Sequence, residues 1–337
     1  MSHLGVISLS AIQKNDKAGI EAAAAKIGQA ARETGFFYIT DHGVDPALIA
    51  RAYAMAEAFF AQSDTEKMAC YIGDSRNHRG YVPFTERGDY ADETNRNYEA
   101  FDLGHGAPRD DPDYQRGVLL TGPNRWPELP GFRQAIGAYY DRISALAMNV
   151  CRFFEIHFGV APGVLTGHMT KPISQLRLLH YVRPPATSAG DSVNMGAHTD
   201  YECLTLLHQR QPGLQVMTRN DEWIDVPVRK GDFVVNIGDM LEAWTNGVFR
   251  ATPHRVLNLS PERYSMPFFL APNHDTVIAP LPGVAKTAAM RRYTPFLAGE
   301  HLQAMLARDF PYLRRRLDRL APAENPFEDR LREGQVT

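Results

Sequence analysis

The sequence has few cysteines, and their arrangement excludes two common kinds of site. Its 337 residues include three cysteines, Cys70, Cys151 and Cys203, and no pair of them has a CxxC spacing. An odd number without paired spacing argues against a disulfide framework and against a cysteine-based zinc site. We therefore expect free cysteines in a reducing compartment, and a cytoplasmic protein. We interpret Cys203 as a small buried apolar residue.

The chain also lacks a long apolar run and a strong charge. No run approaches the roughly 18–20 apolar residues that a membrane span needs, and the N-terminus lacks the features of a secretory signal. The formal net charge of −3 gives no support for a nucleic-acid or membrane surface. Hydrophobic residues make up 44%, which is ordinary for a globular protein. We expect a small molecule as partner, and the sequence carries no signal for an oligomeric state.

Two histidines and one aspartate have a spacing that predicts a metal site. His198 and Asp200 are two residues apart, and His254 follows after 53 intervening residues. Two imidazoles and a carboxylate leave three positions open on an octahedral ion, as in non-haem Fe(II) oxygenases. Residues i and i+2 of a strand share a face, so we expect His198 and Asp200 on one strand and His254 on another. The zinc motif HExxH is absent, and no separate general base suggests a metal-dependent hydrolase.

Arg263 and Ser265 form a second motif, which starts nine residues after His254. They open an apolar run of strand character, so their side chains share a face. A guanidinium fork binds a carboxylate through two parallel hydrogen bonds, and a hydroxyl adds a third. The pair is therefore suited to the far carboxylate of a dicarboxylic co-substrate whose other end chelates the metal. Alone, such a pair is more often part of a surface salt bridge.

The periodicity of the chain changes from helical to extended near its middle. Helical spacing predicts helices over residues 16–33, 46–61 and 131–158, and helix again from Thr294. Between these helices, turn residues separate short predicted strands at 175–182, 204–208, 213–217, 223–228, 232–237, 254–259 and 263–270. Many short strands with regular turns indicate a sandwich or barrel, and a jelly roll suits a metal site carried by two strands.

We therefore expect an α+β fold with a mainly β core. This core is a double-stranded β-helix (jelly roll) backed by helices, with a helical N-terminal region. Residues 1–337 are expected to form a single unit. Within it we expect an N-terminal α/β region over 1–125 that supplies substrate-side loops, a jelly-roll core over 172–280 with the metal and co-substrate site, and a C-terminal helical tail over 294–337.

Short motifs along nearly the whole chain resemble the isopenicillin-N-synthase-like group of 2-oxoglutarate-dependent Fe(II) oxygenases. In the N-terminal half the resemblance rests on residues 7–9, 35–39, 42–43, 79–81, 99–104 and 122–127. In the C-terminal half it rests on residues 196–201, 212–215, 237–239, 246–247, 254–256 and 263–265. The resemblance implies an oxygenase that uses Fe(II), 2-oxoglutarate and O2, and that releases succinate and CO2. Hydroxylation of a small molecule is the implied reaction, with desaturation or ring closure as variants.

The resemblance also implies roles for individual residues. His198, Asp200 and His254 would be the iron ligands, and Arg263 and Ser265 would hold the distal carboxylate of 2-oxoglutarate. Tyr181 would help to hold that carboxylate. Arg177 would reach the chelating end of the co-substrate, with a structural role as the alternative. In the loop over residues 79–89, the candidates for substrate binding are Arg79, Tyr81 and Glu86.

Two alternatives remain open at this point. One is an oxidase of the same fold that needs no 2-oxoglutarate, as in isopenicillin N synthase, where Gln335 would match a C-terminal glutamine that ligates iron. The other is a non-catalytic jelly-roll protein that binds a metabolite. The charged residues Arg79, Glu86 and Arg87 hint at a polar or charged substrate, such as an amino acid or a carboxylated metabolite.

Overall fold

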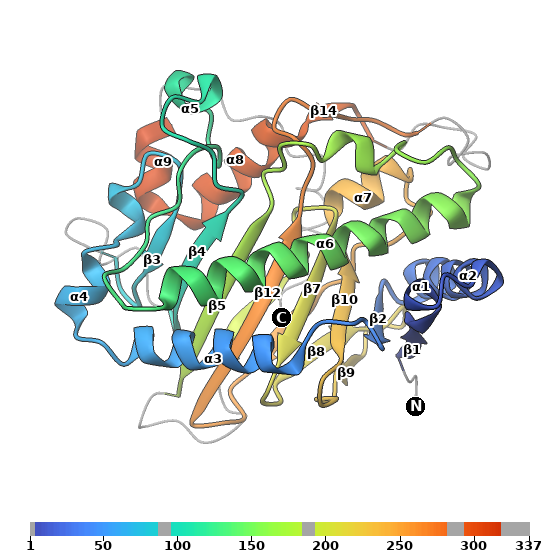
Figure 1. Ribbon diagram of the computed structural model, residues 1–337, viewed down its shortest axis with the longest axis horizontal. Helices are drawn as coiled ribbons and strands as arrows, with labels where there is room; N and C mark the ends of the chain where they lie inside the picture. Colours follow the sequence, from blue (N-terminus) through green and yellow to red (C-terminus); the bar gives the residue numbers. More distant parts are fainter. Residues whose placement is uncertain (1–3, 87–95, 184–192, 282–292, 318–337) are drawn as a thin grey trace.

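The computed structural model describes residues 4–86, 96–183, 193–281 and 293–317. In these ranges a larger and a smaller β-sheet enclose one cavity, and long helices lie across the larger sheet (Figure 1). The helices are α1 (Ser10–Gln13), α2 (Lys17–Glu33), α3 (Pro46–Phe60), α4 (Asp64–Met68), η1 (Ile72–Asp74), α5 (Pro112–Arg116), α6 (Phe132–Phe158), η3 (Thr166–His168), α7 (Asp239–Trp244), α8 (Ala298–Asp309) and α9 (Pro311–Leu317).

The larger sheet has eight strands in the order β1-β2-β10-β7-β12-β5-β4-β3, and the smaller has four in the order β6-β11-β8-β9. Apart from the parallel pair β1 and β2, the pairing within both sheets is antiparallel. The two sheets form the predicted jelly roll. The strands are β1 (Gly5–Ser8), β2 (Phe36–Thr40), β3 (Gly80–Val82), β4 (Tyr98–Gly104), β5 (Gln175–Val182), β6 (Val193–His198), β7 (Leu204–Gln209), β8 (Leu214–Met217), β9 (Trp223–Asp225), β10 (Phe233–Ile237), β11 (His254–Leu257), β12 (Glu262–Leu270), β13 (Val277–Ile278) and β14 (Phe296–Leu297).

The helix α6 covers the larger sheet, and its sequence explains why. The apolar stripe expected over residues 131–158 is buried: Phe132, Ile136, Tyr139, Ile143, Leu146, Ala147, Val150 and Phe154. Figure 1 shows α6 and α3 lying side by side across β5, β12 and β7. The helix ends at Gly159, whose φ of +62° is a left-handed conformation that glycine adopts without strain. This layer leaves the opposite face of the sheet free to line the cavity.

Strands from the N-terminal half complete both edges of the larger sheet. β2 is an aromatic run that pairs with β10, and Phe37 lies opposite Val235. At the other edge β4 pairs with β5, and Asp102 lies opposite Arg177. Each of these strands is joined to a strand more than seventy residues away in the sequence. The register between Asp102 and Arg177 also places two charged side chains next to the cavity.

The expectation that His198 and Asp200 lie on one strand is wrong. β6 ends at His198, and Asp200 lies in the turn that follows. The carbonyls of Asp200 and Glu202 accept hydrogen bonds from the backbone N–H groups of Asp239 (2.8 Å) and Met240 (3.2 Å). The first N–H groups of a helix need such acceptors, and α7 begins here. A Cβ atom at Gly238 would lie 2.3 Å from the Glu202 carbonyl oxygen, so this close approach requires glycine.

The three cysteines are free, as expected, and all are buried, which for Cys203 was also the expectation. The strand predicted over 223–228 is shorter than expected, because β9 spans Trp223–Asp225. Within the part of the chain that the structure describes, no helix has both the length and the apolar character to cross a membrane.

Candidate metal and co-substrate site

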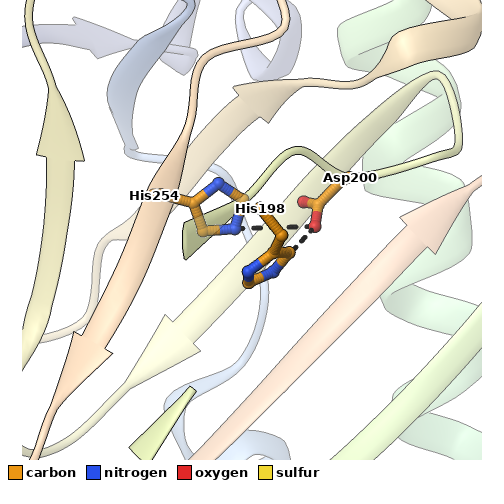
Figure 2. Close-up of side chains that lie close together, drawn as sticks. All are labelled: His198, Asp200 and His254. Carbon is orange, nitrogen blue, oxygen red and sulfur yellow. Dashed lines mark ion pairs between the residues drawn. The ribbon is translucent and has the colours of Figure 1, made fainter. Parts of the chain in front are cut away.

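The three predicted ligands come together in the structure. His198 ends β6 and lies directly opposite His254, the first residue of β11, in the antiparallel ladder. Asp200 approaches from the turn, and its Oδ1 lies 3.7 Å from His198 Nε2 and 3.5 Å from His254 Nε2. The ligand atoms of the three residues lie within 4.8 Å of one another. Figure 2 shows both imidazoles facing the carboxylate, so one ion could contact all three groups.

Hydrogen bonds behind the triad fix which atoms face the ion. The Nδ1 atom of His198 lies 2.8 Å from the Gly196 carbonyl, and that of His254 lies 3.2 Å from the Thr252 carbonyl. A carbonyl only accepts, so each Nδ1 carries the proton and each Nε2 offers a lone pair. Partners of this kind set the tautomer and the ring orientation of metal-binding histidines.

The carboxylate of Asp200 is held in the same way. Its Oδ2 accepts hydrogen bonds from Thr205 Oγ1 and from Asn236 Nδ2, the latter at 2.6 Å. Oδ1 is thus left facing the imidazoles. Burial raises the pKa of this carboxyl, but His254, His198 and the two hydrogen bonds outweigh it, so its pKa lies below the usual range.

Burial, together with the nearby His198, lowers the pKa of His254 to about 4. The imidazole of His254 is therefore neutral and the carboxylate of Asp200 is charged near pH 7, which are the protonation states that bind a metal. Two imidazole nitrogens and one carboxylate oxygen, with no fourth protein ligand in this cluster of described residues, fit a ferrous ion with open positions.

Arg263 lies in the wall of the same cavity and has no carboxylate partner among the described residues. The side chain is 2% exposed. Its Nη1 donates to Ser265 Oγ at 3.1 Å and its Nη2 to Gln209 Oε1 at 3.2 Å, while its buried Nε has no partner in the described chain. The guanidinium lies over the ring of Tyr181, 4.9 Å from its centre. A buried cation without a counter-ion is costly, so this arrangement favours an anionic ligand.

The cavity between the sheets has a volume of about 380 Å³. Alternate residues of β12 and β5 line it, as expected for one face of a sheet: Arg263, Ser265, Pro267 and Phe269 from β12, and Gln175, Arg177, Leu179 and Tyr181 from β5. The triad, Arg263, Ser265 and Tyr181 thus line one shared cavity. The volume lies near the lower end of the roughly 300–1,000 Å³ typical of small-molecule sites.

The other predicted residues do not all reach this cavity. Arg177 is in its wall, but its Nε and Nη2 donate to the two oxygens of Asp102, each at 2.7 Å. This pairing is the structural role that was the alternative for Arg177.

Arg79, Tyr81 and Glu86 do not line the cavity, in contrast to the expectation that they bind substrate. Arg79 is fully buried and donates to the carbonyls of His78 and Leu120. Tyr81 donates to Glu99 at 2.6 Å. Other protein groups bind all three side chains. We therefore infer that Arg79, Tyr81 and Glu86 support the cavity wall from its outer side. Arg87 and Gln335 lie outside the described residues.

Apart from Arg177, the residues that close the other end of the cavity were not predicted from the sequence. This end, which we call the α8 end, consists of Arg96, Arg177, Tyr201, Glu202, Arg308, Asp309 and Phe310. Glu86, although outside the cavity, pairs with Arg96 at 2.9 Å and so positions it. Tyr201 donates to Asp309 at 2.7 Å, which ties the turn after Asp200 to α8. Apart from Arg177 and Tyr201, these residues stand in no short motif, because they come together only through the docking of α8.

A double-stranded β-helix with an open His-Asp-His site, and a buried arginine that has no carboxylate partner among the described residues, defines a non-haem iron oxygenase that takes an anionic co-substrate. The comparisons with known families agree. Residues 4–129 match the family described as "non-haem dioxygenase in morphine synthesis N-terminal", and residues 173–272 match the 2OG-Fe(II) oxygenase superfamily. The chain belongs to the 2OG-Fe(II) oxygenase superfamily and is a 2-oxoglutarate-dependent dioxygenase. Its cofactors are Fe(II), 2-oxoglutarate and O2.

Relatives of known name cover most of the chain. A homoarginine-6-hydroxylase of Arabidopsis thaliana is 32% identical over 302 residues, which are 85% of this chain and 81% of that protein. Among solved structures, a 2OG-Fe(II) oxygenase family protein from Caulobacter crescentus is 30% identical with a TM-score of 0.79, and covers 92% of this chain and 100% of that one. A Neurospora crassa protein in complex with α-ketoglutarate and thymine is 26% identical with a TM-score of 0.79, and covers 91% and 97%.

Proposed function

We propose that the protein hydroxylates a small molecule. In this reaction 2-oxoglutarate and O2 are consumed, one oxygen atom enters a C–H bond of the substrate, and the other enters the succinate that forms as CO2 leaves. Hydroxylation is favoured over desaturation or ring closure because a relative that spans most of the chain is a hydroxylase. The observation that carries the proposal is the buried Arg263, which has no counter-ion in the described chain and shares a cavity with the His-Asp-His triad.

In this reaction His198, Asp200 and His254 would hold the iron ion. Bound iron supplies the redox chemistry with 2-oxoglutarate and O2. The hydrogen bonds that the histidines donate to the Gly196 and Thr252 carbonyls, and those that Asp200 accepts from Thr205 and Asn236, keep the ligand atoms turned toward the ion. These hydrogen bonds set the orientation of the ligand atoms before the reaction, so the protein does not need to reorganise during it.

Arg263, Ser265 and Tyr181 bind the distal carboxylate of 2-oxoglutarate. The guanidinium fixes the orientation of the carboxylate, and Ser265 adds a hydroxyl. The ring of Tyr181 packs against the guanidinium and holds it in place. Burial raises the pKa of Tyr181, so the phenol stays protonated and can donate a hydrogen bond to a carboxylate. The apolar side chains Leu179, Leu207 and Phe269 in the same wall exclude water from the reacting atoms.

Labelled oxygen tests the proposal. The protein is incubated with Fe(II), 2-oxoglutarate, heavy-oxygen O2 and a panel of small molecules, and succinate and products are measured by mass spectrometry. We expect one heavy oxygen atom in succinate and one in the product. A product that has lost two hydrogens without gaining oxygen would show desaturation instead. O2 consumption that does not need 2-oxoglutarate, or a product without a heavy oxygen atom, would contradict the proposal.

A further inference from the structure

The α8 end of the cavity contains three arginines that the proposed reaction does not use. Arg96, Arg177 and Arg308 all line it, and they come from three separate segments of the chain. Arg96 and Arg177 flank the ring of Phe310, with guanidinium carbons 5.2 Å and 5.8 Å from the ring centre. Arg263 lies elsewhere in the wall, with Tyr181, Ser265 and Gln209 as its neighbours. The cavity thus has two separate basic regions.

Arg177 is held so that one part of its guanidinium remains available. Asp102 accepts from Nε and Nη2, which form one side of the guanidinium. Nη1, on the other side, has no hydrogen bond to any described residue. The cross-strand register of β4 and β5 fixes this geometry, since Asp102 lies directly opposite Arg177. The Asp102 side chain is 1% exposed, so the arginine is fixed from behind and faces a cavity in front. A fixed donor of this kind can bind an anion at little entropic cost.

Arg96 is held in a similar way. Its Nη1 donates to Glu86 at 2.9 Å, and its Nη2 donates to the Asp309 carbonyl at 3.3 Å. The Glu86 side chain is fully buried, so Arg96 is also anchored from behind. Arg308 is more exposed, at 43%, and its Nη2 donates to Tyr201 Oη. Of the three, Arg177 and Arg96 are therefore the rigid ones.

We propose that the α8 end binds a carboxylate group of the primary substrate, with Arg177 as the main anchor and Arg96 beside it. The proposal rests on the proposed function, in which Arg263 takes the carboxylate of 2-oxoglutarate and leaves the α8 end for the substrate. The carboxylate of Asp309 lines the same end and would repel a molecule with several negative charges. The substrate class is therefore a small molecule with a single carboxylate. Phe310 and Leu306 provide apolar contacts for its carbon frame.

Matched pairs of probes test this inference. Protein loaded with Mn(II) and saturating 2-oxoglutarate is titrated with benzoate, hexanoate and N-acetylglycine, and with the primary amide of each, and binding is measured by calorimetry. We expect at least one carboxylate to bind about tenfold more tightly than its amide, which is the lower range for a charge-assisted hydrogen bond. The same carboxylate should not compete with 2-oxoglutarate.

A double variant, Arg177→Met with Asp102→Asn, removes the anchor without leaving a buried unpaired carboxylate. We expect its preference for the carboxylate over the amide to fall below about threefold, with the affinity for 2-oxoglutarate retained. Retained affinity for 2-oxoglutarate also shows that the variant is folded. Arg116→Met, on the exposed helix α5, is the matched control and should keep the full preference.

Any one of several results would overturn the inference. They are no binding by any carboxylate probe, equal binding of acids and amides, a preference that survives in the double variant, and carboxylates that compete with 2-oxoglutarate. If the double variant instead loses affinity for 2-oxoglutarate while Arg116→Met does not, Arg177 serves the co-substrate and the inference is wrong. Failure of the proposed function itself would be seen separately, as an absence of Mn(II)-dependent 2-oxoglutarate binding in the unmodified protein.

Discussion

The two ends of the cavity are built in different ways. The metal and 2-oxoglutarate residues lie on or next to β5, β6, β7, β10, β11 and β12, and each metal ligand is oriented by a backbone carbonyl or a buried side chain. The α8 end is assembled from segments far apart in the sequence, and buried carboxylates hold its two rigid arginines. The first end has the fixed ligand geometry that one reaction type requires. The α8 end has the makeup of a pocket that sets substrate specificity. Loop and helix residues on a rigid scaffold commonly carry such specificity.

Among the variants that compare the two ends, removal of a metal ligand is expected to have the largest effect on iron binding and CO2 release. Asp200→Ala takes away the carboxylate that both imidazoles face, so we expect iron binding and 2-oxoglutarate-dependent CO2 release to fall to background. Iron content and CO2 release measure the two effects. His105→Ala changes an exposed histidine outside the cavity and should leave both unchanged. Full iron binding by the Asp200 variant would place the metal elsewhere.

The variant Arg263→Met tests whether Arg263 binds the carboxylate of 2-oxoglutarate. Loss of a charge-assisted pair costs about 1.5–3 kcal/mol, so we expect the KM for 2-oxoglutarate to rise about 10- to 150-fold. Iron binding without 2-oxoglutarate should be unchanged. Arg263→Lys keeps the charge but not the two-pronged geometry, and should give an intermediate KM. Steady-state kinetics with varied 2-oxoglutarate makes this measurement, and an unchanged KM in the methionine variant would assign the carboxylate to another residue.

Thr205→Val tests the contact behind Asp200. The hydroxyl of Thr205 donates to Asp200 Oδ2, and the loss of a contact behind a metal ligand weakens metal binding by about tenfold or somewhat more. Thr205→Ser keeps the hydroxyl and should bind iron normally. Anaerobic titration of both variants with Fe(II) measures the difference. Equal affinities in the two would mean that Asn236 alone orients the carboxylate.

The smallest effect is expected at the α8 end. Tyr201→Phe removes the hydrogen bond to Asp309 and the one accepted from Arg308, both of which are partly exposed. We expect a loss of at most about 1 kcal/mol in the free energy of unfolding, with iron and 2-oxoglutarate affinities unchanged. Thermal unfolding measures the first and calorimetry the second. A large loss of iron binding would show that the docking of α8 also maintains the metal site.

The same difference between the two ends explains how much the sequence could predict. His198, Asp200, His254, Arg263 and Ser265 stand in short motifs with fixed spacing, and strand alternation correctly placed Arg263 and Ser265 on one face. The position of Asp200 could not be derived from alternation, because β6 stops at His198 where the carbonyls of Asp200 and Glu202 accept from α7. That contact depends on a segment nearly forty residues away.

The helices and the core strands were predictable for a similar reason. The apolar stripe on α6 is a local pattern, and this helix formed where expected. Arg79 shows the limit of such reasoning. In the sequence it stands in a polar loop and suggests substrate binding, yet in the structure it is fully buried behind the cavity wall. Whether a charged side chain faces a cavity or supports its wall is decided by tertiary packing.

Stepwise anaerobic titration tests most directly that iron and 2-oxoglutarate share the site between the triad and Arg263. Fe(II) is added first, then 2-oxoglutarate, and the visible charge-transfer absorption of an iron-bound 2-oxo acid is followed in the unmodified protein and in Asp200→Ala. The structure predicts one iron ion per chain and an absorption that needs both additions and is lost in the variant. The same absorption in the Asp200 variant, or 2-oxoglutarate that binds equally well without metal, would contradict it.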